Sequence, residues 1–163
     1  MNVANYQKPD VIRAALGKRR IAIVGLSANE LRASNFVGYY MLRHKYEVIP
    51  VNPRESKILG QTCYPSLLAI PGVVDVVDVF RAIDAVPGIA REAVKIGAKH
   101  LWLQFGVISE EGVQIAEEGG LECIVDCCLK VEHARYIGRM HWLGFNTQAV
   151  SYTHLTLPTN REV

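Results

Sequence analysis

The sequence has no long uninterrupted apolar run and no strong excess of charge of one sign. Its most apolar stretches, such as 21–26 and 73–80, are far shorter than the roughly 20 residues that a membrane-spanning helix needs. Residues 1–10 lack the apolar core of a signal peptide. The 18 basic and 16 acidic residues leave a formal charge of +2, which argues against broad electrostatic binding of nucleic acid or anionic membranes. We therefore expect a cytoplasmic protein that binds neither.

Cysteine is also scarce. The sequence contains only Cys63, Cys123, Cys127 and Cys128. These residues are too few and too clustered for a disulfide-built scaffold, and no pair has the C-x-x-C spacing of common zinc loops. We predict reduced thiols packed at the end of a buried strand, in a reducing compartment, and no metal site.

The chain is long enough for one domain with a continuous core. Its 163 residues are 50% hydrophobic, which predicts a single domain over residues 1–150. The remaining segment, 151–163, reads SYTHLTLPTNREV and shows neither helical nor strand periodicity. It resembles translated sequencing-adaptor read-through, so we predict a non-native or disordered tail and give it no functional role.

Short apolar segments that predict buried strands alternate with amphipathic segments that predict helices. Strands are expected at 20–25, 46–51, 73–80, 100–104 and 121–125, and helices at 9–16, 34–44 (capped by Ser34), 86–96, 109–118 and 128–137. Strands separated by helices of this length need crossover connections, which make the sheet parallel. The predicted fold is α/β: a Rossmann-like, doubly wound parallel sheet of about five strands in three α/β/α layers.

Ligands of such sheets bind beyond the carboxyl ends of the strands. Gly25-Leu26-Ser27 follows the first strand and leads into a helix, whose N-terminus favours a phosphate. Arg32 and Asn35 add a cation and an amide to the same loop. Turn geometry alone also explains a glycine at this position, so the pattern needs further support.

The details disfavour NAD as the ligand. In the fingerprint G-x-G-x-x-G, Ser27 stands at the second glycine and Glu30 at the third. The second strand tip reads Val51-Asn52-Pro53-Arg54 and lacks the acid that binds the ribose hydroxyls of NAD. The sequence therefore favours a nucleotide ligand other than NAD.

Several motifs occur in an order that is typical of one family. They are IAIVGLS followed by Arg32, Ser34 and Asn35, then YEVIPVNP, ILGQTCYPSL, VDVVDVF, LWLQFGVISEEG, Asp126 and Cys128. Over about residues 13–145, the chain resembles the small stand-alone CoA-binding proteins, which are similar to the nucleotide-binding domain of the succinyl-CoA synthetase alpha subunit. The resemblance implies that CoA or an acyl-CoA is the ligand.

The resemblance also implies a place for each part of CoA. It assigns the pyrophosphate to Gly25, Leu26, Ser27, Arg32 and Asn35, and the adenosine to Val51, Asn52 and Pro53. The third tip, Phe80-Arg81-Ala82, closes the pocket where family members often have two prolines. From their positions after the second and third strand tips, Arg54 is a candidate to bind the 3′-phosphate and Arg81 to bind another phosphate. Either arginine could also be a solvated surface side chain. Gln104 and Gly106, at the fourth tip, are expected to line the pocket.

No catalytic residue is predicted. Succinyl-CoA synthetase acts through a phosphorylated histidine in a second domain, which the resemblance does not reach. No acid or nucleophile can be assigned beside His44, His100, His133 or His141. His44 and His100 lie at a predicted helix end and strand start, where solvated or dipole-facing histidines are ordinary. Trp102 and Phe105 are expected to be mostly core or helix contacts, and Asp75 and Asp78 receive no role. Two alternatives remain: an NADP-type oxidoreductase using Arg54, and an interaction module regulated by its ligand.

Overall fold

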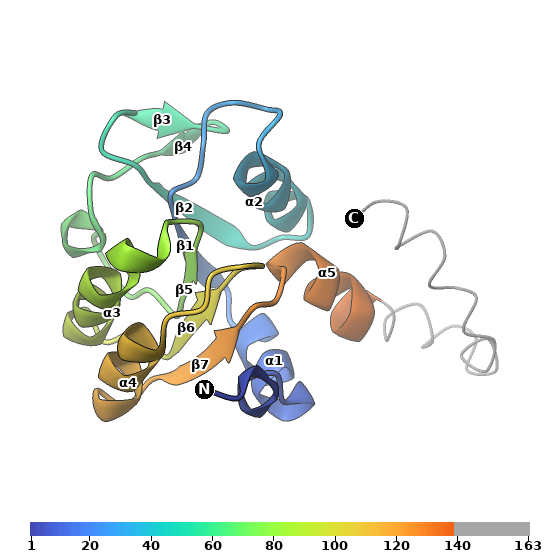
Figure 1. The fold of residues 1–163 in the computed structure, drawn as a ribbon. Coiled ribbons are helices and arrows are strands. Elements are labelled where there is room, and N and C mark those ends of the chain that lie inside the picture. The colour runs from blue at the N-terminus through green and yellow to red at the C-terminus, as the bar shows by residue number, and fades with distance from the viewer. Residues whose placement is uncertain (139–163) are drawn as a thin grey trace, which may run out of the picture.

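The computed structural model describes residues 1–138 and contains a five-stranded parallel sheet (Figure 1). The strands are β1 (Arg20–Val24), β2 (Glu47–Val51), β5 (Val76–Val79), β6 (His100–Leu103) and β7 (Glu122–Val125), in the order β2-β1-β5-β6-β7. Every neighbouring pair is parallel. The predicted fold class is therefore confirmed.

Helices cover both faces of the sheet (Figure 1). Helices α1 (Pro9–Leu16), α2 (Ala33–Arg43) and α5 (Leu129–His133) share one buried cluster, and α3 (Val86–Lys95) and α4 (Glu110–Glu118) share the other. Strand β1 shows why its sequence is continuously apolar. Ala22 and Val24 face the α3 and α4 layer, whereas Ile21 and Ile23 face the opposite layer. A strand buried on both faces has no solvent side that would favour polar residues.

Several predicted boundaries are wrong. The third strand begins at Val76 rather than residue 73, because Asp75 turns its carboxylate to accept the Arg20 backbone N–H at 3.1 Å. Ser34 does not cap α2, since the helix begins at Ala33 with Arg32 as its cap. The last helix ends at His133 and continues as a π-helical turn over Ala134–Gly138.

Small elements add to the predicted pattern. The antiparallel hairpin of β3 (Lys57–Ile58) and β4 (Gln61–Thr62) follows β2, and a 3-10 turn at Val3–Tyr6 precedes α1. The predicted domain limit at residue 150, the predicted tail 151–163 and His141 lie outside the described residues.

The four cysteines are free thiols, three of them buried and Cys128 half-buried. Across residues 1–138, no group of three or more metal-ligating side chains is placed to hold an ion. In the same range, no helix combines the length and apolar character needed to cross a bilayer.

A cluster of aromatic side chains joins α2 to α5. The Tyr40 hydroxyl is 2.9 Å from His133 Nδ1, and the His44 ring centre is 4.8 Å from that of His133. His133 is only 3% exposed. Burial, with smaller contributions from His44 and Arg19, lowers the pKa of His133 to about 4. The folded protein therefore holds this ring neutral at pH values where the unfolded chain protonates it.

We expect the cluster to make folding sensitive to acid. An unfolded histidine has a pKa of about 6.5, so stability from His133 is complete above that pH and declines as pH falls toward about 4. The loss between pH 6.5 and pH 5 should be about 2 kcal/mol. Urea denaturation at several pH values should show a shallower decline for His133→Gln, which retains His44 and His100. Equal declines for the variant and the original protein would contradict this assignment.

Candidate functional site

The carboxyl ends of all five strands finish level with one another. The register aligns Val51, Val24, Val79, Leu103 and Val125 in one row across the sheet. The residues that follow this row are Asn52, Gly25, Phe80, Gln104 and Asp126. The chain winds outward in opposite directions from β1 and β5, so the topological switch point lies between these two strands. The crevice above the switch point is the expected ligand position. Four of these five residues were predicted site residues, and Asp126 was named in the family motifs without a role.

Gly25 lies where the loops after β1 and β5 touch. Its φ is +88°, and a Cβ added to it would lie 2.4 Å from the Phe80 carbonyl oxygen and 2.9 Å from Arg81 Cδ. The chain's own β5 loop therefore requires a glycine here, in addition to any requirement from a ligand.

Buried polar side chains hold the loop after β1 in place. Ser34 Oγ accepts the Ser27 backbone N–H at 3.0 Å, and Asn35 Nδ2 donates to the Ser27 carbonyl at 2.8 Å. Both side chains belong to α2 and are 5% exposed. Ser27 Oγ in turn accepts the Asn29 backbone N–H. The amide of Asn35, which we expected to meet a pyrophosphate, is thus bonded to the loop that would hold it.

Asn52 connects this loop to the tip of β2. Its Nδ2 donates to the Leu26 carbonyl at 3.1 Å, and its Oδ1 accepts the Arg54 backbone N–H at 2.9 Å. The side chains of Leu26 and Val51 are buried in the core. Their backbone, rather than their side chains, therefore lies at the predicted site.

A pocket of about 390 Å³ opens beside the switch point. It is lined by Ala33, Val37, Phe80, Arg81, Ala82, Gln104, Phe105, Val107 and Cys128. The pocket brings together the predicted residues Phe80, Arg81 and Gln104. Phe105 is 57% exposed, so the prediction that it is mostly a core or helix contact is wrong, whereas Trp102 is fully buried as expected.

Two carboxyl groups near this edge had no predicted role. Asp126 has φ +61° and its Oδ1 accepts the Gly106 backbone N–H at 2.7 Å, which fixes the loop after β6. Asp78 lies fully buried in β5 and accepts a hydrogen bond from Gln104 Nε2 at 2.6 Å. A carboxylate directly after a strand is a recognisable sequence pattern, but the contact between Asp78 and Gln104 spans two strands and has no local pattern.

Positive charge gathers on the loops around the switch point. Arg32, Arg54 and Arg81 follow β1, β2 and β5 respectively, and all three side chains are exposed. The ion pairs formed within residues 1–138 include none of them. Three exposed guanidinium groups at one sheet edge favour a ligand with several phosphates.

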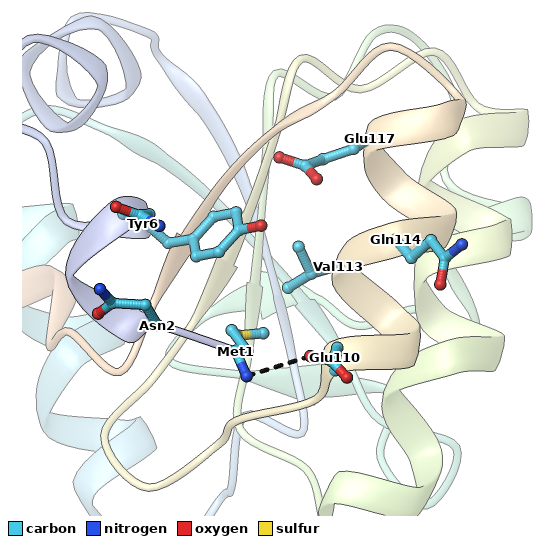
Figure 2. Close-up of a pocket in the computed structure, with 8 residues that line it drawn as sticks. Met1, Asn2, Tyr6, Glu110, Val113, Gln114 and Glu117 are labelled. Atoms are coloured by element: carbon cyan, nitrogen blue, oxygen red, sulfur yellow. Dashed lines mark ion pairs between the residues drawn. The ribbon is translucent and has the colours of Figure 1, made fainter.

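A second cavity, of about 250 Å³, lies between the N-terminal segment and α4 (Figure 2). The Met1 ammonium group forms an ion pair with Glu110 Oε2 at 3.2 Å, and Glu117 also lines the cavity. Its two carboxylates disfavour a phosphate-bearing ligand. This second cavity contains none of the predicted site residues. His100, expected to be solvated or to face a helix dipole, is instead buried at the start of β6, beside Glu122.

Comparisons with known proteins show which family the chain is similar to. A family model described as "CoA binding domain" matches residues 19–134. An uncharacterised protein of Bacillus subtilis, YneT, is 39% identical over 80% of this chain and 96% of its own length. A solved hypothetical protein from Pyrococcus horikoshii is 35% identical, with a TM-score of 0.80 over 84% of this chain and 97% of that one.

A larger protein shares the same unit. An ADP-forming acetate–CoA ligase of Archaeoglobus fulgidus is 28% identical over 67% of this chain, which spans only 17% of the ligase. The region that the family model matches, residues 19–134, includes the sheet, the loop after β1 and the pocket-lining loops after β5 and β6. The chain belongs to the CoA-binding domain family.

Proposed function

We propose that this protein binds CoA or an acyl-CoA at the carboxyl edge of its sheet. The observation that carries the proposal is the set of three exposed arginines, Arg32, Arg54 and Arg81, on the loops around the switch point, none of which forms an ion pair within residues 1–138. CoA carries a pyrophosphate and a 3′-phosphate, so its charge complements these side chains.

The loops suggest how the nucleotide end would lie. The pyrophosphate would approach the loop Gly25 to Ser27, held by Asn35, at the N-terminal end of α2. The adenosine would lie against the tip of β2, at Asn52 and Pro53. The remaining arm of CoA would then enter the neighbouring pocket.

We propose a binding protein without catalysis of its own. Cys128 is the thiol among the pocket-lining residues, and burial, reinforced by the nearby Asp78 carboxyl, raises the pKa of this thiol. A raised pKa keeps the thiol in its weakly nucleophilic neutral form. We also propose the cytoplasm as its compartment, because four free cysteines suit a reducing environment.

Thermal unfolding with added ligand tests the proposed function. CoA at a hundredfold excess over its dissociation constant should stabilise the folded protein by about 2.7 kcal/mol, which raises Tm by roughly 5 to 10 °C for a chain of this size. NAD should have little effect. Stabilisation by NADP but not by CoA would support an oxidoreductase instead and contradict our proposal.

Arg54 should distinguish CoA from dephospho-CoA, which lacks the 3′-phosphate. A charge-assisted contact is worth about 1.5 to 3 kcal/mol, or roughly a ten- to hundredfold preference for CoA. Arg54→Ala should remove most of this preference and leave the affinity for dephospho-CoA nearly unchanged. Titration calorimetry with both ligands measures the effect. An equal loss for the two ligands, or no loss for either, would exclude Arg54 as the 3′-phosphate partner.

A further inference from the structure

Asp78 is a carboxyl group in the interior of a parallel sheet. It occupies the third position of β5, with Ile23 of β1 and Trp102 of β6 as its register partners, and is 0% exposed. An isolated charge in such a position is strongly unfavourable, whereas a neutral, hydrogen-bonded carboxylic acid is tolerated. The group therefore needs a structural explanation that the sheet itself does not supply.

Its hydrogen-bond partner belongs to the pocket. Gln104 Nε2 donates to Asp78 Oδ1 at 2.6 Å, while the same glutamine lines the 390 Å³ pocket. A glutamine amide has two donor hydrogens and an acceptor oxygen. The bond to Asp78 uses one hydrogen, which leaves the other hydrogen and Oε1 for a ligand. Asp78 thus determines how the amide is turned.

The second oxygen of Asp78 is an independent observation. Oδ2 is buried and has no hydrogen-bond partner among residues 1–138. Burial raises the pKa of Asp78 to about 8, despite the opposing effect of the bond from Gln104. The neighbouring strands present Ile23 and Trp102, the α2 side of the pocket presents Ala33 and Val37, and the start of α5 presents the Cys128 thiol.

The lining of the pocket indicates which ligand chemistry it fits. Phe80, Phe105, Val37 and Val107 make most of the wall apolar, and Gln104 contributes an amide. The pantetheine arm of CoA has a matching composition, because methylene groups separate its two amides. The nucleotide end carries the phosphates, which suit the arginines of the loops after β1 and β2, Arg32 and Arg54, while Arg81 lines the pocket beside Phe80.

We propose that Gln104 hydrogen-bonds an amide of the pantetheine arm and that Asp78 is the positioning residue that orients it. This inference rests on the proposed function and extends it, since it makes the pocket selective for ligands that carry the arm. Gln104 touches the ligand, and Asp78 acts only through Gln104.

The test compares two ligands with and without the arm. One is CoA methylated on its sulfur, so that its thiol no longer titrates, and the other is adenosine 3′-phosphate 5′-diphosphate. The Kd of the nucleotide fragment divided by the Kd of methylated CoA measures how much the arm contributes to binding. Gln104→Leu, which keeps the size of the side chain, should lower this ratio about five- to tenfold and leave the affinity for the nucleotide fragment unchanged.

Two variants of Asp78 separate positioning from folding. Asp78→Ala should lower the ratio as Gln104→Leu does, whereas the isosteric and neutral Asp78→Asn should retain it at pH 7. In the original protein the ratio should fall as pH rises above about 8, because binding excludes water from the pocket and favours the neutral acid. In Asp78→Asn the ratio should stay constant with pH.

The outcomes distinguish this inference from the proposed function. If Gln104→Leu keeps the original ratio, even with an equal loss of affinity for both ligands, Gln104 does not bind the arm. If the original protein and Asp78→Asn share one pH profile, Asp78 does not orient Gln104. Either result overturns the inference while CoA binding stands. If the original protein binds neither ligand, the proposed function fails and the inference fails with it.

Discussion

Replacing Gly25 by alanine should abolish CoA binding and lower the free energy of unfolding by about 2 to 4 kcal/mol. The added Cβ meets two penalties, the positive φ of +88° and a distance of 2.4 Å to the Phe80 carbonyl oxygen. Relief requires the loops after β1 and β5 to separate, and these loops form the switch point. Calorimetric titration at a temperature where the variant is folded should show CoA affinity at least roughly hundredfold weaker.

Gly97 provides a matched control. Its φ is +77°, yet nothing lies within 4 Å of an added Cβ. Gly97→Ala should therefore carry only the backbone penalty, about 1 kcal/mol, and should bind CoA normally. A folded Gly25→Ala protein with the same CoA affinity as Gly97→Ala would show that the ligand binds elsewhere.

Replacing Trp102 by alanine should cause the largest loss of stability, about 3 to 5 kcal/mol. The indole is fully buried between the sheet and the helices on the α2 side, and its Nε1–H donates to the Cys127 carbonyl at 2.9 Å. The variant therefore creates a cavity and leaves a buried carbonyl without its donor. Urea denaturation measures the change through the midpoint and the m-value.

Phe105, three residues along the chain, is the control for this effect. It is 57% exposed and lines the pocket. Phe105→Ala should change the free energy of unfolding by about 0.5 kcal/mol or less and should weaken CoA binding instead. A loss below about 1 kcal/mol for Trp102→Ala would contradict the assignment of Trp102 to the core.

The contrast between these two aromatics shows where sequence periodicity stops being informative. Strand β6 ends at Leu103, so the burial on both faces that keeps Trp102 in the core does not extend to Phe105. The boundaries of β5 and α2 were also wrong, because polar side chains at these ends accept backbone N–H groups of another segment. Asp75 is bonded to Arg20, and Ser34 is bonded to Ser27 rather than capping its helix.

The hairpin of β3 and β4 was not predicted, for a different reason. Each strand has two residues, too few to show any alternation. The five main strands were predictable because burial on both faces demands continuous apolar runs. Their parallel arrangement followed from the helices between them.

The sequence by itself determined the strands, the helices between them and the residues at the strand tips, among them Gly25, Asn52 and Gln104. Such features depend on neighbours along the chain, which a periodic pattern records. Only the tertiary structure decided that Asp78 bonds to Gln104, that Gly25 meets the Phe80 carbonyl and that His133 is buried against Tyr40. Each of these contacts joins residues from different elements, so packing alone brings their atoms together.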